Sequence, residues 1–249
     1  MKLVRTLLSA CILSGLAISL AHAGPQKFEF HEYGVDLNIE VIKMPHFPNS
    51  LIADGYLEGD VKIAMDIDHD GELRDWIVIE STHPEFTESV ERVIDSWRFS
   101  PPYINGENRS VVNHLNIHFE SRGSVVSFDL PTSVLNVRLN QLTGFRSEAS
   151  KLSDIKELDT APYPIAQPSP SIPKDVIQKH DGTRAVFTFY IDEAGQVRIP
   201  ALSETDGEPD LGMLLATQDA LSQWRFQPPT KNNRPVKVKL SQAFVFKDK

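Results

Sequence analysis

One six-residue motif occurs twice in this 249-residue chain and constrains the fold more than any other feature. Residues 97–102 and 224–229 both have the sequence W-R-F-x-P-P, and each is followed by an Asn, an Arg and a Val. The chain contains only three tryptophans, so a second copy of a motif centred on tryptophan indicates duplication rather than chance. Because repeats determine the architecture of a chain, we expect two copies of one structural unit.

The segments upstream of the two motifs also align. Residues 63–74 (IAMDIDHDGELR) correspond to residues 187–198 (FTFYIDEAGQVR). In both copies an apolar run precedes a D-x-x-G turn, which predicts a β-hairpin. The run at 61–67 alternates, as in a strand with one buried face, whereas the run at 186–191 is more uniformly apolar, as in a strand covered on both sides. An apolar stripe with helical spacing then ends at the tryptophan, at 86–97 and at 213–224. We expect the Pro-Pro pairs to stop these helices, and a third strand to follow in each copy.

The segment D-x-D-x-D-G at 66–71 matches the start of an EF-hand calcium loop. That loop needs a chelating carboxylate at its twelfth position, where this chain has Ile77. The second copy keeps only the second aspartate and the glycine, as a tight turn requires, because Asp accepts local backbone hydrogen bonds and Gly tolerates positive φ. The sequence therefore predicts turn residues and no metal site; the turn residues are Asp68, Gly71, Asp192 and Gly195.

The N-terminus has the pattern of a secretory signal peptide covering residues 1–23. Lys2 and Arg5 precede an uncharged run at 6–21, and Ala21-His22-Ala23 is an A-x-A cleavage site. The run is shorter than the ~20 residues that span a bilayer, so an uncleaved inner-membrane anchor is the less favoured alternative. Cleavage would remove Cys11, the only cysteine, and with it any disulfide or thiolate chemistry.

Charge and motifs exclude several classes of function. The formal charge is −9, and about −11 without the two basic residues of the signal peptide, which disfavours nucleic acid as a partner. The sequence has no G-x-S-x-G elbow, phosphate loop or H-E-x-x-H motif. His114 and His118 would lie ~13 Å apart on one strand, too far to share an ion. We therefore predict no catalytic residue, metal or cofactor, and keep an enzyme built from distant residues as the residual alternative.

The predicted fold class is α+β, with two tandem domains that each pack a three-stranded antiparallel sheet on a helix. The predicted boundaries are 1–23 for the signal peptide, 24–122 for the first domain with an N-terminal extension, 123–160 for a connector and 161–249 for the second domain. The tryptophans end apolar stripes, which favours core positions over ligand stacking. The predicted core residues of the motif are Trp97, Phe99, Trp224 and Phe226. For Arg98 and Arg225 we favour local pairing with helix-end groups over contact with a partner.

Each copy resembles the C-terminal domain of TonB, the periplasmic energy-transducer family. The resemblance rests on W-R-F-x-P-P followed by Asn and a strand, on the D-x-x-G hairpin, and on an apolar-Pro entry at Phe47-Pro48. In the second copy the entry is either Tyr163-Pro164 or Ile172-Pro173. The resemblance covers roughly 45–120 and 162–247, most of the chain after the signal peptide.

The resemblance implies a small α+β domain that binds short segments of outer-membrane transporters by strand addition. In this mode the backbone supplies the affinity, so no reactive side chain is needed. The implied docking edges are the third strands, at 111–119 and 236–244. The candidate binding residues are Val111, Asn113, Leu115, Ile117, Val236, Val238 and Leu240.

Two departures from the family change the expected function. The N-terminal segment resembles a cleavable signal rather than a retained membrane helix, and no long Pro-rich spacer precedes the first copy. We therefore expect a periplasmic tandem binder of a protein or peptide in the cell envelope, for example an outer-membrane transporter. The acidic charge favours a partner with basic character.

The alternative is a structural scaffold or homo-oligomer whose sheet edges pair with each other, since exposed edges promote association. Within this alternative, Lys237 and Lys239 are candidate blocking charges on the second edge, which would leave the first edge as the only binder.

Overall fold

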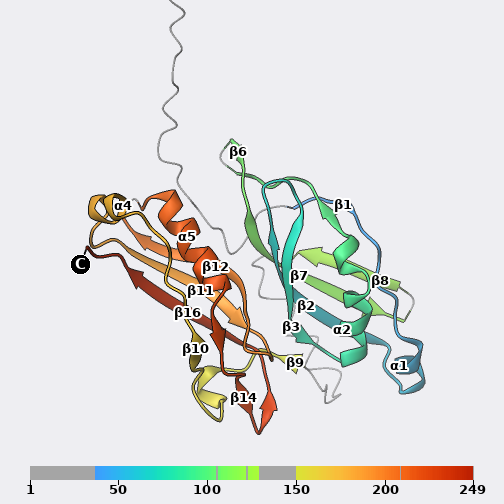
Figure 1. The fold of residues 1–249 in the computed structure, drawn as a ribbon. Coiled ribbons are helices and arrows are strands. Elements are labelled where there is room, and N and C mark those ends of the chain that lie inside the picture. The colour runs from blue at the N-terminus through green and yellow to red at the C-terminus, as the bar shows by residue number, and fades with distance from the viewer. Residues whose placement is uncertain (1–36, 105, 122, 129–149, 208, 249) are drawn as a thin grey trace, which may run out of the picture.

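The computed structural model describes residues 37–104, 106–121, 123–128, 150–207 and 209–248, so the predicted signal peptide lies outside the described residues. The chain forms two α+β units, each built on an antiparallel sheet that packs against a helix (Figure 1). This confirms the predicted fold class. Within the described ranges, every helix is too short or too polar to cross a membrane.

The first unit has a five-stranded antiparallel sheet in the order β8-β7-β2-β3-β9. Its three central strands are those expected from the sequence, and two further strands from the segment 123–160 extend the sheet at both borders. The strands are β2 (Glu58–Ile67), β3 (Leu73–Ser81), β7 (Val111–Glu120), β8 (Gly123–Phe128) and β9 (Ser150–Lys151). The helices are α1 (Asn49–Ala53), α2 (Pro84–Glu91) and the short 3₁₀ helix η1 (Ile94–Ser96).

The second unit has a three-stranded antiparallel sheet in the order β12-β11-β16. Its strands are β11 (Arg184–Ile191), β12 (Val197–Asp206) and β16 (Val238–Val245). Its helices are α4 (Lys174–Lys179) and α5 (Leu211–Ser222), and η2 (Ile155–Glu157) precedes them in the joining segment. β16 is thus the counterpart of β7, but it lies at the border of its sheet.

Short strand pairs complete each unit in the same way. The motif residues Arg-Phe form one strand of the first pair, which an upstream segment joins: β1 (Ile39–Val41) with β4 (Arg98–Phe99), and β10 (Pro164–Ala166) with β13 (Arg225–Phe226). A small hairpin then follows the prolines: β5 (Tyr103–Ile104) with β6 (Glu107–Asn108), and β14 (Thr230–Lys231) with β15 (Arg234–Pro235).

The helices end earlier than predicted. α2 stops at Glu91, and after η1 the backbone of Trp97 is extended, with φ −77° and ψ 148°. In the second copy α5 stops at Ser222, before the tryptophan. The Pro-Pro pairs are therefore not what stops the helices. The next residues of the motif pair with β1 or β10, which requires an extended backbone.

Each unit buries its own core between sheet and helix, and the two tryptophans occupy equivalent places in these cores. Trp97 is completely buried and Trp224 is 7% exposed. The indole Nε1–H of Trp97 donates to the Lys43 carbonyl, and that of Trp224 to the Pro168 carbonyl, both at 3.0 Å. Phe99 and Phe226 are buried in the same two cores.

These bonds also resolve the second apolar-Pro entry. Phe47-Pro48 lies four residues after Lys43, and Ile172-Pro173 lies four residues after Pro168. Each proline is the N-cap of the helix that follows it, α1 or α4. Ile172-Pro173 is therefore the counterpart of Phe47-Pro48, whereas Pro164 belongs to β10.

The two units pack against each other through the sheet faces that their helices leave uncovered. A third apolar cluster joins them; it contains Ala64, Ile77, Ile79 and Val112 of the first unit and Tyr190, Ile199 and Ala201 of the second. A polar contact closes this cluster, since His114 Nε2 lies 3.0 Å from the Tyr190 hydroxyl. We call this region the joint between the copies.

Candidate partner-binding edge

The D-x-x-G turn and the W-R-F motif form one hydrogen-bonded unit in each copy. Asp68 Oδ1 accepts the N–H groups of Asp70 and Glu72 at 3.0 and 2.9 Å, and the carbonyl of Gly71, whose φ is +84°, accepts the Phe99 N–H at 3.1 Å. The second copy repeats every bond: Asp192 with Ala194 and Gln196, and Gly195, at φ +78°, with Phe226.

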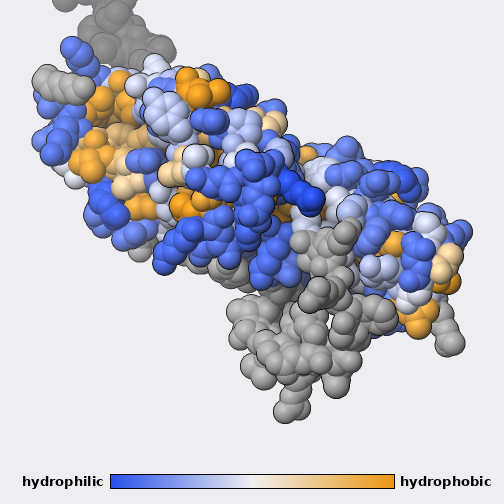
Figure 2. Space-filling model, turned by 90° about the horizontal axis from the view of Figure 1, so that it is seen from below, coloured by the Kyte–Doolittle hydropathy of each residue, from blue (hydrophilic) through white to orange (hydrophobic). Residues whose placement is uncertain are grey.

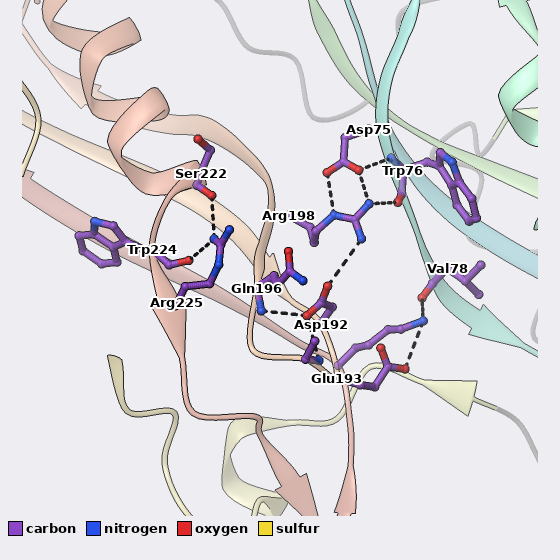
Figure 3. A network of polar contacts seen from close by, with 12 residues as sticks. Asp75, Trp76, Val78, Asp192, Glu193, Gln196, Arg198, Ser222, Trp224 and Arg225 are labelled. Carbon is purple, nitrogen blue, oxygen red and sulfur yellow. Dashed lines mark hydrogen bonds and ion pairs between the residues drawn. The ribbon is translucent and has the colours of Figure 1, made fainter. Parts of the chain in front are cut away.

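The arginines of the motif are used locally. Arg225 donates to the carbonyls of Ser222 and Trp224 at 3.1 and 2.8 Å (Figure 3). Arg98 makes the same two contacts, with Asp95 and Trp97. Both arginines therefore satisfy carbonyls at the end of a helix, where a cation is favoured.

β16 is the border strand of the second sheet. It pairs with β11 from Val238 to Val245 without a register shift, and within the described residues no other strand lies on it. Just beyond its end, the Phe246 N–H donates to the Thr183 carbonyl at 3.0 Å and the Phe246 carbonyl accepts from Gly182 at 2.7 Å. The peptide groups of residue 246 therefore point towards β11.

The direction of the other peptide groups follows from this contact. Successive residues of an antiparallel strand direct their N–H and C=O groups alternately to one side and the other. Counting back from Phe246, every second residue of β16 directs its peptide groups away from the sheet. These residues are Lys239, Ser241, Ala243 and Val245.

The first copy fills the corresponding border with its own chain. β8 pairs with β7 from Leu115 to Glu120, so β7 lies inside its sheet, between β2 and β8. This corrects the expectation that the third strand of the first copy is a border strand. Leu115 and Ile117 fall within the covered stretch, while Val111 and Asn113 precede it and have buried side chains. Partner binding by these residues stays a prediction.

In the second copy the candidates Val238 and Leu240 lie on β16, whereas Val236 precedes the strand and bonds the Pro229 carbonyl at 2.9 Å. Val238 is fully buried and Leu240 is packed against the core. The residues whose peptide groups point outward are not these candidates, because the candidates were chosen for their apolar side chains. Alternation in the sequence shows which side chains are buried, but not which peptide groups point outward.

The two lysines near this border make different contacts. Lys237 donates to the Val78 carbonyl of the first unit at 3.0 Å and pairs with Glu193 at 3.4 Å (Figure 3). Lys239 lies over the Tyr190 ring, 5.7 Å from its centroid. Lys237 thus helps to hold the joint, so the expectation that it blocks the edge is wrong.

A network of charges surrounds the joint. Arg198 of β12 donates to both carboxylate oxygens of Asp75 on β3, through Nε at 3.0 Å and through Nη2, and also to the Trp76 carbonyl at 2.8 Å (Figure 3). The hydrogen bond to Asp75 raises the pKa of Arg198. Asp66, on β2, is the residue that lies directly opposite Asp75 of β3. Burial, together with the charges of Asp75 and Asp68, raises the pKa of Asp66 to about 6 despite the opposing charge of Arg74.

The described residues bring together one group that could hold a cation. The side-chain ligand atoms of Asp68, His69 and Asp70 lie within 4.8 Å of one another. Asp68 Oδ1 is already used by two backbone N–H groups of the turn. Exposed acidic groups of this kind are common without an ion.

Among the described residues, the exposed apolar side chains come from several separate segments of the chain. In Figure 2, hydrophilic residues surround separate apolar areas on the face that is drawn. The most exposed include Tyr103 on β5, and Tyr163 and Ile165, which lie just before and on β10. This surface favours recognition through a strand border over recognition through one large apolar patch.

Comparison with known proteins identifies the family. Residues 43–121 and 168–247 each match the sequence model described as "Gram-negative bacterial TonB protein C-terminal". The chain belongs to the TonB C-terminal family. The Pseudomonas aeruginosa TonB C-terminal domain, solved by NMR, is 21% identical over 36% of this chain and 90% of its own, with a TM-score of 0.31. No curated protein sequence matches the chain.

Membership of the TonB C-terminal family confirms two of the predictions. The resemblance stated from the motifs is correct for both copies, and TonB C-terminal domains are non-catalytic, so the protein is not an enzyme. Membership also relates the chain to TonB-type energy transducers, which are proteins of the cell envelope.

Proposed function

We propose that this tandem TonB C-terminal protein is a periplasmic binding module that takes up an extended segment of an envelope protein as an added strand on β16. The observation that carries the proposal is the border of β16, where four residues direct their peptide groups away from the sheet. Strand addition draws its affinity from such groups. The candidate partner is a cell-envelope protein, for example an outer-membrane transporter, and export follows from a cleaved signal at 1–23.

The first copy supports this mode of binding. Its β8 pairs with β7 as an antiparallel strand at the border that corresponds to β16. The same small sheet therefore accommodates one more strand on this side without loss of its helix or core. We assign the binding role to the second copy, while the first keeps its border satisfied with its own chain.

The charge on β16 favours a partner segment with an acidic residue. Lys239 is the one charged residue of β16, whereas Lys237 precedes the strand and is paired with Glu193. This local charge opposes the basic partner expected from the net charge of the whole chain.

The domain boundaries proposed from the sequence are 24–122, 123–160 and 161–249. The segment 123–160 supplies β8 and β9 to the first sheet. It also contains η2, which precedes the second unit in the chain. We propose that it is a working part of the first unit rather than a passive connector.

A proline substitution at one outward-directed N–H tests the proposal. In Ala243→Pro the lost N–H is not bonded to β11, so the fold should persist, as proline is tolerated at a sheet edge. The matched control is Ala243→Val, which keeps the N–H and adds a β-branched side chain. The mature protein is used to capture partners from an envelope extract, and melting curves verify folding.

We expect Ala243→Val to recover the same partner as wild type and Ala243→Pro to recover much less at an unchanged melting temperature. Equal recovery by a folded Ala243→Pro would refute strand addition at β16. Sedimentation of the free protein addresses the alternative: a tight dimer that Ala243→Pro dissociates would assign β16 to self-association instead.

A further inference from the structure

The opposite border of the second sheet, formed by β12, differs between the copies in an informative way. In the first copy the corresponding strand β3 carries β9, with Lys151 opposite Glu80 and Ser150 opposite Ser81. The next residue continues the contact, because the Leu152 N–H donates to the Ile79 carbonyl at 3.0 Å. The chain therefore shows which kind of segment this border accepts: a short extended stretch with a lysine facing a glutamate.

A shared irregularity fixes the equivalence between β3 and β12. In β3 the register against β2 shifts at Ile79, between the pairs Ile63–Val78 and Lys62–Glu80. In β12 the register against β11 shifts in the same place, at Ser203 between Leu202 and Glu204. A β-bulge at the same point in both copies makes Ser203 the counterpart of Ile79, and Glu204 the counterpart of Glu80.

The border of β12 carries no such strand within the described residues; β12 pairs there with β11 alone. Its outer half is exposed and acidic: the side chains of Glu204 and Asp206 are 61% and 64% exposed. Arg184 is the cation nearest to both, at 3.5 and 3.8 Å. One arginine facing two carboxylates leaves this border negative, whereas the lysine-bearing border of β16 is positive.

We propose that residues 203–206 of β12 form a second docking border, which binds an extended segment of a partner protein that places a basic residue opposite Glu204. The segment lies on β12 as Ser150 and Lys151 lie on β3, and its backbone N–H reaches the Ser203 carbonyl as Leu152 reaches Ile79. Opposite charges on directly facing residues of paired strands are stabilising, which sets the preference for a basic residue. One sheet then takes up two segments of opposite charge, one on each border.

The probe for this border is a peptide with the sequence of residues 148–153, EASKLS, which contains the segment seen on β3. Its counterpart, EASELS, replaces the lysine with glutamate. Each peptide is titrated into the ¹⁵N-labelled mature protein, and amide chemical shifts report both the place and the strength of binding. The protein variant is Glu204→Lys, and the matched control is Glu91→Lys, an exposed glutamate at the end of α2.

We expect EASKLS to shift amides at 203–206, and EASELS to bind about fivefold more weakly, the effect of one cross-strand ion pair. Glu204→Lys should reverse this preference and bind EASELS better, whereas Glu91→Lys should behave as wild type. The reversal distinguishes a direct contact from a loss of folding.

Three outcomes would overturn the proposal. The first is the absence of shifts at 203–206, and the second is equal affinity for the two peptides. The third is a border already protected from hydrogen exchange in the free protein, which would show that another part of this chain occupies it. Shifts confined to β16 are a case of the first outcome: they exclude β12 as the docking border and leave the proposed function at β16 in place.

Discussion

Gly71 and Gly195 explain at the level of single residues why the D-x-x-G turn and the W-R-F-x-P-P motif occur together in both copies. A Cβ on Gly71 would overlap the carbonyl oxygen of Phe99, and one on Gly195 would overlap that of Phe226. Both glycines also have positive φ, which the turn requires. The glycine of D-x-x-G thus makes room for the W-R-F backbone, and neither motif can change alone.

Substituting Gly71 with alanine should therefore cost more than the strain of positive φ. That strain alone is about 1–2 kcal/mol, and Gly55→Ala measures it, because Gly55 has φ +87° and open space around its Cβ position. We expect Gly71→Ala to lower the free energy of unfolding by a further ~2 kcal/mol or more, since the Phe99 backbone must move. Urea denaturation of both variants provides the measurement, and equal losses would show that the overlap is relieved without cost.

At the level of elements, the sequence predicted what local patterns determine. The alternation at 61–67 and the Asp–Gly turn predicted the hairpin of each copy. Apolar spacing up to Trp97 overestimated the helix, because a buried extended residue fits the same spacing as a helical one. β9 could not be predicted, since Ser150–Lys151 has no alternation and its pairing depends on a distant strand. β8 is a local hairpin partner of β7, with Gly123 opposite Glu120, and it was missed. Because β8 was missed, so was the difference between the covered border of the first copy and the open border of β16.

The hairpin β14–β15 depends on a carboxylate from the joining segment. Asp159 accepts the N–H groups of Asn232 and Asn233, both at 2.9 Å, and both residues have positive φ. These bonds lower the pKa of Asp159, chiefly the one from Asn233. A depressed carboxyl pKa means that the contact is fully present above the ordinary pKa and is lost as the pH falls through the lowered value.

We expect Asp159→Asn to loosen this turn at neutral pH, because the amide offers one acceptor oxygen in place of a carboxylate. Amide hydrogen exchange at Asn232 and Asn233 should become several-fold faster, with the rest of the second unit unchanged. Asp175→Asn, on the exposed side of α4, is the control. Unchanged exchange at both asparagines would show that the hairpin holds its turn without the joining segment.

At the scale of the whole molecule, the joint makes the two copies one assembly rather than two independent domains. Its apolar cluster joins both sheets, and Arg198 of the second copy binds Asp75 of the first. Asp66 is the unfavourable member of this arrangement. It is half-buried beside Asp75, and no hydrogen bond to its carboxyl is among the described contacts, so its ionised form is disfavoured.

The joint should therefore become more stable as the pH falls towards mildly acidic values. The pKa of Asp66 is raised from an ordinary 3.8 to about 6 in the folded protein. A raised carboxyl pKa gives a contribution to stability that is complete below pH ~4 and is lost as the pH rises through 6, amounting to about 3 kcal/mol.

Asp66→Asn cannot ionise, so it should unfold at higher urea concentration than wild type at pH 8 and at a similar concentration at pH 4. The exposed control Asp54→Asn should follow wild type at both values. If Asp66→Asn instead lowers stability at pH 8, the ionised carboxylate of Asp66 makes a stabilising contact at the joint. Asp66 would then help to hold the two copies together rather than weaken their contact.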